Sequence, residues 1–76
     1  MARYFFDLND GSDIPDEIGR EIADLAALRR EALRVMTSLT AAEAEDAKDT
    51  TLVMTVRDEA GRTPLKVRLV CQVEEF

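Results

Sequence analysis

The segment from residue 24 to about residue 46 is the one stretch of this chain with the period of a long amphipathic helix. At roughly 100° per residue, its apolar side chains fall within an arc of roughly 120°. These side chains are Leu25, Leu28, Ala32, Val35, Met36, Leu39 and Ala42. Asp24 precedes them as a good N-cap, because its carboxylate can accept from the free amides of the first turn. A helix with a single apolar stripe needs a surface to cover it, so the remaining residues must supply one.

The other side of the predicted helix is polar, with Arg30 and Arg34 on its back. Leu33 lies off the stripe, which places it at the stripe's margin or in contact with a second chain. The acidic run that ends at Asp46 lies at the negative end of the helix dipole, which disfavours it. We therefore expect the helix to fray over residues 47–50.

Four other segments alternate between apolar and polar residues as strands do, over residues 3–8, 16–22, 51–57 and 65–73. In the second of these, Ile18 and Ile22 should face inward, with Gly19 at a bend or a bulge. The run Asp58-Glu59-Ala60-Gly61 fits a type I turn between the last two strands, with Gly at the position that needs a positive φ.

These elements predict a single α+β domain over residues 1–76, an antiparallel sheet in the order β-β-α-β-β with the helix across one face. About 18 apolar side chains would form its core, which is close to the lower limit for a stable domain. Self-association would help so small a fold, because each copy could cover apolar surface of the other.

The composition argues against most enzyme classes. The chain has no histidine, which removes Ser-His and Cys-His nucleophiles and the usual zinc sites. Its one cysteine, Cys71, lies on the inward side of the last strand, where a buried thiol is usually inert. We therefore predict that the protein is not an enzyme.

Charge and hydropathy indicate where in the cell the protein is located. The chain is 46% hydrophobic and 34% charged, as in globular proteins, and its net charge is −6. No apolar run approaches the ~20 residues that span a bilayer, and no basic-then-apolar leader opens the sequence. A lone cysteine also agrees with a reducing compartment. We expect a cytoplasmic protein with no membrane contact.

An acidic cluster near the N-terminus is the first candidate site, and its members are Asp7, Asn9, Asp10, Asp13, Asp16 and Glu17. Such oxygens could hold a hard cation, but a calcium loop that began at Asp7 would need Gly at Ser12 and Glu at Ile18. Asp and Asn are also ordinary turn residues. We predict no bound metal and no cofactor.

The sheet face away from the helix is the second candidate site. The alternation places on it Arg3, Phe5, Val53, Arg57, Lys66, Arg68 and Val70, together with Thr55 and Gln72. This open face is either solvated, with cationic stems over apolar neighbours, or buried against another chain, or a site for single-stranded nucleic acid. We predict a homodimer formed through this face or an edge strand, with a different protein as the other candidate partner. The alternative is a small regulator that binds nucleic acid through Arg3, Arg57, Lys66 and Arg68, which the net charge of −6 disfavours.

Several short motifs occur along the chain in a fixed order and spacing. They are Arg3-Tyr4-Phe5-Phe6-Asp7, Asp10-Gly11, Pro15-Asp16-Glu17 with Gly19, Asp24-Leu25, Arg30-Glu31-Ala32-Leu33 and Asp58-Glu59-Ala60-Gly61-Arg62. In this order and spacing they resemble a family of short proteins, mostly from rhizobia and related alphaproteobacteria, catalogued as a domain of unknown function. The resemblance implies a cytoplasmic, single-domain α+β protein and carries over no catalytic residue. The basic, Val-rich last strand and the tail from Cys71 to Phe76 depart from the family pattern.

Overall fold

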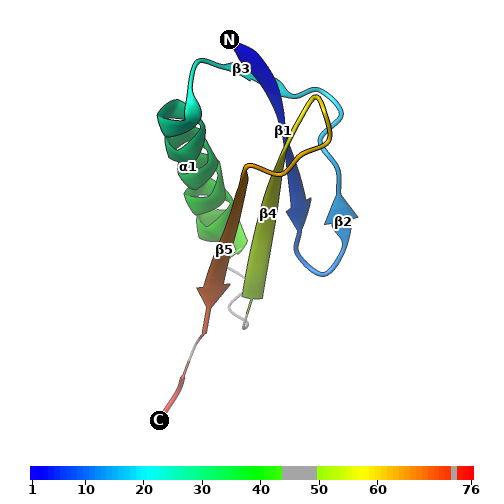
Figure 1. Cartoon of the computed structure of the whole chain (residues 1–76). Coiled ribbons are helices and arrows are strands. Elements are labelled where there is room, and N and C mark those ends of the chain that lie inside the picture. The colour runs from blue at the N-terminus through cyan, green and yellow to red at the C-terminus, as the bar shows by residue number, and fades with distance from the viewer. Residues whose placement is uncertain (44–49, 73) are drawn as a thin grey trace.

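The elements of the chain follow one another in the order that the sequence predicts, with one strand split in two. A computed structural model describes residues 1–43, 50–72 and 74–76. Its elements are β1 (Ala2–Asn9), β2 (Asp13–Ile14), β3 (Arg20–Ile22), α1 (Leu25–Glu43), β4 (Thr50–Asp58) and β5 (Leu65–Cys71) (Figure 1). The fold is α+β, as predicted.

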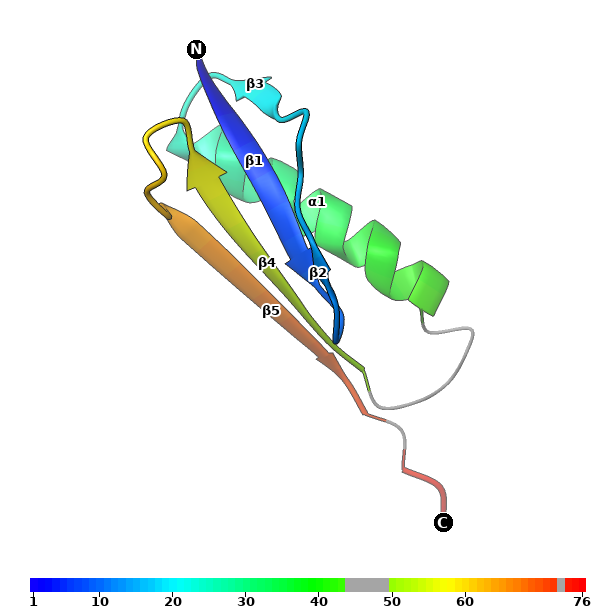
Figure 2. The ribbon, with the colours of Figure 1, turned by 90° about the vertical axis from the view of Figure 1, so that its right-hand side faces the viewer.

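The sheet is antiparallel throughout and has the order β2-β1-β4-β5. The remaining strand, β3, pairs with β1 through Ala2 to Tyr4, on the side away from β4. Strand β1 therefore lies inside the sheet, with β4 on one side and β2 and β3 on the other. The helix lies across one face of the sheet and packs against β3, β4 and β5 (Figure 2).

The predicted return strand over residues 16–22 is wrong in its first half. The chain pairs with β1 as the two short strands β2 and β3, and a turn leaves the sheet between them. Pro15 has no amide to donate, and Gly19 has a φ of 75°, so this turn does not continue a ladder. Ile18 is consequently 81% exposed rather than inward, whereas Ile22 is buried as predicted.

Helix α1 begins where the sequence predicts. The Asp24 carboxylate accepts a hydrogen bond of 2.7 Å from the Ala27 amide, and the Asp24 carbonyl accepts one of 3.0 Å from the Leu28 amide. Asp24 is thus the N-cap. The predicted continuation to residue 46 and the fraying over 47–49 fall on residues outside those that the structure describes, and Thr50 already belongs to β4.

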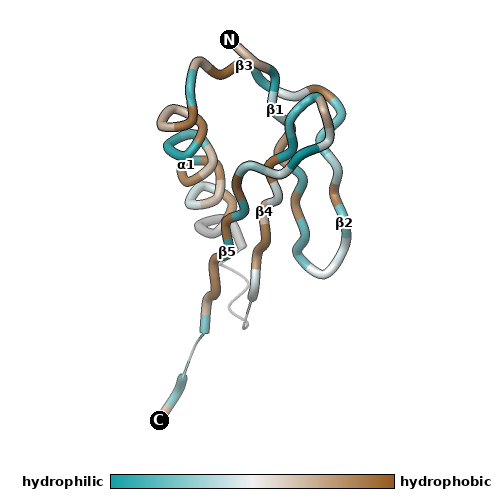
Figure 3. The backbone as a smooth tube through the Cα atoms, viewed as in Figure 1, coloured by the Kyte–Doolittle hydropathy of each residue, from teal (hydrophilic) through white to brown (hydrophobic). Residues whose placement is uncertain are grey.

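The core lies between the helix stripe and the inner face of the sheet. Figure 3 shows brown, hydrophobic stretches on α1, β4 and β5. The buried members of the core are Phe6, Ile22, Leu28, Ala32, Met36, Leu52, Met54 and Val56. Val35 and Leu39 pack against them, as predicted. The prediction that Leu25 belongs to the buried stripe is wrong, because Leu25 is 65% exposed, whereas Leu28 in the same turn is 1% exposed.

The turn between β4 and β5 has the geometry that its sequence indicates. The Asp58 carbonyl accepts from the Gly61 amide at 3.1 Å, and Gly61 has a φ of 82°. The Asp58 carboxylate also accepts from the amides of Ala60 and Arg62, at 3.0 and 2.9 Å. This Asx geometry explains why Asp stands at the first position.

Two leucines of α1 provide a test of the core assignment. Leu28→Ala should lower the free energy of unfolding by ~2–5 kcal/mol, because Leu28 is 1% exposed and its removal leaves a cavity. Leu25→Ala is the matched control and should change it by less than ~0.5 kcal/mol. Urea or thermal unfolding followed by circular dichroism measures both, and equal losses would contradict this packing.

Candidate interaction surface

The open face of the sheet is assembled from β1, β4 and β5 in the register that the alternation predicts. Phe5 lies opposite Arg57, and Val53 lies opposite Arg68. One further row places Thr55 beside Lys66, and another places Thr51 beside Val70. The seven predicted interface residues therefore share one face, together with Asp7 and Asn9, which the prediction assigned to the acidic cluster.

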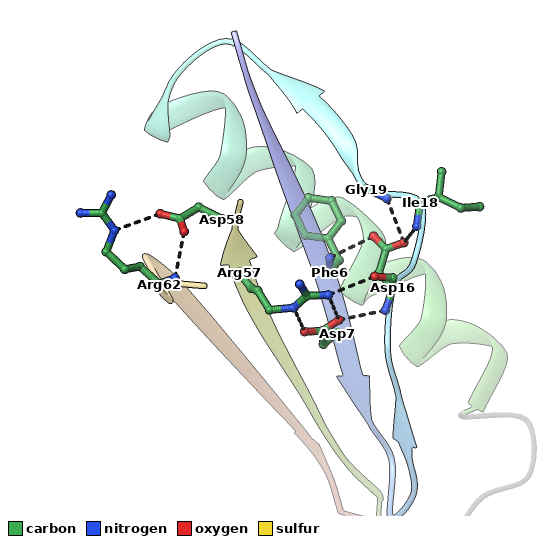
Figure 4. A network of polar contacts seen from close by, with 8 residues as sticks. All are labelled: Phe6, Asp7, Asp16, Ile18, Gly19, Arg57, Asp58 and Arg62. Carbon is green, nitrogen blue, oxygen red and sulfur yellow. Dashed lines mark hydrogen bonds and ion pairs between the residues drawn. The ribbon is translucent and has the colours of Figure 1, made fainter. Parts of the chain in front are cut away.

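An ion pair joins two strands on this face. The Arg57 Nε atom donates to Asp7 at 2.7 Å, and its Nη2 atom donates to the second carboxylate oxygen at 3.4 Å (Figure 4). The same Nη2 atom donates to the Asp16 carbonyl at 3.2 Å. Arg57 therefore uses its guanidinium to hold β4, β1 and the β2–β3 connection together.

The Asp16 carboxylate fills the gap between β2 and β3 along β1. One of its oxygens accepts from the Phe6 amide at 3.0 Å, which takes the place of a missing strand partner. Its other oxygen accepts from the amides of Ile18 and Gly19, at 3.0 and 3.1 Å (Figure 4). In the other direction, the Asp16 amide donates to Asp7 at 2.9 Å. A side chain thus completes an interrupted edge.

These contacts shift the acidity of both carboxyls. The Arg57 hydrogen bond lowers the pKa of Asp7 against the opposing effect of partial burial. Partial burial alone would raise the pKa of Asp16, but the amides of Phe6, Gly19 and Ile18, with help from Arg20, hold that pKa below its usual value. Both groups are therefore anions over the physiological range. The same ion pair raises the pKa of Arg57.

Phe5 is covered on this face by its neighbours. The Arg57 guanidinium lies 4.6 Å from the ring centroid, in a cation–π contact. Gly19 approaches the ring so closely that a Cβ atom there would lie 2.9 Å from Phe5 Cε1. Glycine at position 19 is thus required both by its φ and by the ring beside it. Phe5 is half-buried and has little surface left for stacking on a base.

The four predicted cations fall into two pairs. Arg3 donates to the Ile18 carbonyl at 2.6 Å and pairs with Glu21 at 3.3 Å, and Arg57 is engaged as described. Lys66 and Arg68 are exposed on β5, and within the described ranges neither has an ion-pair partner. Only the β5 pair therefore remains available to a partner.

One cation that the prediction did not single out lies on the inner face. Arg20 of β3 is 5.5 Å from the Phe6 ring centroid and pairs with Glu31 of the helix, which also pairs with Arg34. The Arg34 hydrogen bond lowers the pKa of Glu31. The sequence signal for the Glu31 contact is the position of Arg20 two residues before Ile22.

Most carboxylates of the acidic cluster accept hydrogen bonds from donors of the same chain. Besides Asp7 and Asp16, Asp13 accepts from the Asn9 side chain at 2.7 Å, and Asp10 accepts from the Ser12 amide at 3.2 Å. Among the residues placed by the structure, no three acidic or cysteine side chains are grouped so that they could hold a metal. The prediction that the protein binds no metal stays a prediction.

The two edges of the sheet differ. Beyond β1, the edge consists of the two-residue β2, the three-residue β3 and the Asp16 turn between them. Beyond β4, it is the seven-residue β5, which contains neither glycine nor proline and pairs only with β4 among the described strands. Strand β5 thus presents a continuous row of backbone groups on its outer side.

A groove lies between α1 and the β2–β3 connection. Apolar side chains of Leu8, Ile14, Ile18, Val35 and Leu39 line much of it, with Asp16 and Arg20 at its polar side. Asp16 is already bonded to three amides, and Arg20 is paired with Glu31. The lining therefore offers no free acid–base pair.

The comparisons with known proteins identify the family. The domain of unknown function DUF6894 matches residues 3–70, which is most of the chain. The chain belongs to this family. No curated protein and no solved structure matches it at a significant level. The DUF6894 match ends at residue 70, within β5. In the described parts of this DUF6894 protein, no helix is long and apolar enough to cross a membrane.

Asp16→Asn tests the carboxylate bridge. An amide side chain has one acceptor oxygen instead of two, so at least one of the three backbone amides loses its partner. We expect the free energy of unfolding to fall by ~1–3 kcal/mol. Glu17→Gln removes the same charge from the exposed neighbouring residue and should leave stability nearly unchanged in the same denaturant titration. Equal effects would show that net charge matters and the bridge does not.

The lowered pKa values of Asp7 and Asp16 predict a loss of stability in acid. Well above their ordinary value of 3.8, both carboxyls are ionised in the folded and unfolded chains, so their stabilising contribution is fully present and does not change with pH. As the pH falls through that value, the unfolded chain takes up protons before the folded one, so stability declines until the folded carboxyls are protonated too. Melting temperatures measured from pH 7 to about pH 2.5 should show this decline.

Asp7→Asn should make that decline shallower, because one of the two shifted groups is gone, whereas Glu17→Gln should keep the wild-type profile. A decline of the same steepness in Asp7→Asn and in the wild type would mean that Asp7 gains nothing from Arg57.

Proposed function

We propose that this protein is a non-enzymatic, cytoplasmic interaction module that forms a homodimer, and that β5 is the strand through which it does so. The observation that carries the proposal is the open edge of β5 beside a sheet whose opposite edge is closed by Asp16 and two short strands. We also propose, from the family resemblance, that proteins of this kind occur mostly in alphaproteobacteria.

A strand edge binds by adding another strand. Its unpaired amides and carbonyls take the partner's backbone as a further member of the sheet, and the alternating side chains select the register. Strand β5 supplies the half-buried Leu65, Val67 and Leu69 on the helix side. Its open-face side carries Val70, which is 62% exposed. This combination of open backbone and exposed apolar side chains supports association at β5.

The internal partners of the cations support this proposal over the nucleic-acid alternative. Arg3 and Arg57 are occupied by acceptors of the same chain, and Phe5 is covered, so the face retains two cations and no free aromatic ring for single-stranded nucleic acid. The net charge of −6 adds a general repulsion from phosphate.

Light scattering should give twice the mass of one chain at micromolar concentration. Val70→Lys should shift the protein toward the mass of one chain, because it adds a third cation to the open-face side of β5. Val53→Lys is the matched control: it adds the same charge to the same face on β4, away from the edge, and should leave the dimer intact. Circular dichroism verifies that both variants are folded.

The other outcomes separate the alternatives. If both variants dissociate the dimer, the open face rather than the β5 edge is the contact. A wild-type monomer at these concentrations would overturn the proposal. A monomer that shifts the mobility of single-stranded oligonucleotide at low salt, with the shift lost as salt rises, would support the nucleic-acid alternative instead.

A further inference from the structure

We infer that the second copy pairs with β5 in one register, antiparallel, with the two Leu69 residues opposite each other on the dimer axis. This inference rests on the proposed function and names its partner and geometry. In this register, Val67 of one copy faces Cys71 of the other, and Arg68 faces Val70. The two sheets would join into one continuous sheet.

The pleat of the strand limits the choices. Opposite residues in an antiparallel pair lie on the same face of the sheet. In a twofold-symmetric pair of β5 strands, residue i of one copy lies opposite residue j of the other, and the sum of the residue numbers i and j is the same for every opposite pair. Because alternate residues of a strand point to the same face, i and j share a face only when this sum is even, so each allowed register has one residue opposite its own copy. Within the middle of β5, the candidates for this central residue are Lys66, Arg68 and the three apolar residues Val67, Leu69 and Val70.

Repulsion between like charges removes three of these registers. A centre at Arg68 places the two Arg68 side chains opposite each other, and a centre at Lys66 does the same with lysine. A centre at Val67 places Lys66 opposite Arg68 twice. Like charges directly opposite each other destabilise a strand pair. A centre at Leu69 avoids all of these contacts, because Arg68 then faces Val70 and Lys66 faces Gln72.

Length decides between the two registers that remain. A centre at Val70 also avoids like charges, but it keeps only residues 69–71 of β5 in the pairing, whereas a centre at Leu69 keeps residues 67–71. The Leu69 register therefore gives the longer pairing between the two copies of β5.

The helix provides an independent reason for this arrangement. Glu31 contacts Arg20 of β3, so that flank of α1 faces the β3 side of the sheet. Leu33 is two residues further on, roughly 200° around the helix, which turns it toward the β5 side. It is 37% exposed. Pairing at β5 about an axis normal to the sheet puts both helices on one face, with each Leu33 turned toward the other copy.

Cysteine cross-linking tests the register, with a thiol reagent that spans up to about 8 Å, enough for the ~5.5 Å between opposite Cβ atoms. Val67→Cys with native Cys71 should link two chains, because these positions face each other across the axis. Val67→Cys with Cys71→Ser, and the native protein with Cys71 alone, should not link, because each residue is then ~14 Å from its own copy. Leu69→Cys with Cys71→Ser should link.

The outcomes distinguish this inference from the proposed function. A dimer by light scattering that links through Cys71 alone, or through Val67→Cys in the Cys71→Ser background, has another register and overturns the inference while self-association stands. A dimer that links in none of the variants pairs elsewhere and also overturns it. A monomer by light scattering overturns the inference together with the proposed function. Lys66 and Arg68 are kept in every variant.

Discussion

The sheet depends on one carboxylate that replaces a strand. On the side of β1 away from β4, the strand pairs with β3 as far as Tyr4 and with β2 from Leu8 onward. The amide of Phe6 lies between these two segments and would have no backbone partner there. Asp16 accepts from that amide and from two amides of its own turn. Because an unpaired amide costs about as much as a lost hydrogen bond, this side chain allows the chain to leave the sheet and return to it.

The same turn is connected to the distant hairpin. Asp7 receives the Asp16 amide on one side and the Arg57 guanidinium on the other, and Arg57 also reaches the Asp16 carbonyl. Phe5 is enclosed between Arg57 and Gly19. The family motifs around residues 3–7 and 15–19 are therefore parts of one structural unit, which explains why aromatic, acidic and glycine residues occur together there. In this unit they connect the first hairpin and its turn to β4.

Much of the fold follows from periodicity, and the polar network does not. The stripe centred on Leu28 and Met36, the alternation of β4 and β5 and the Asx turn at Asp58 are local patterns, and the structure has each of them. Ile18 was misplaced because a side chain, rather than the ladder, holds its segment. Periodicity assigned Arg57 to the open face correctly, but the face to which a residue points does not reveal its partner, and Asp7 lies 50 positions earlier.

The central place of β1 also affects how the chain folds. Strands β4 and β5 are joined by a short turn and can pair locally, whereas β1 must wait for β4, from which the whole helix separates it in sequence. Pairings between distant segments form late, because loop closure has to come before any contact is gained. We expect the β4–β5 hairpin and the helix to assemble first. Strand β1 would then pair with β4, with the Asp16 turn along its other side. Until it does, β4 has an open edge as well, and a newly made chain passes through a state in which both sides of the hairpin can pair with the wrong strand.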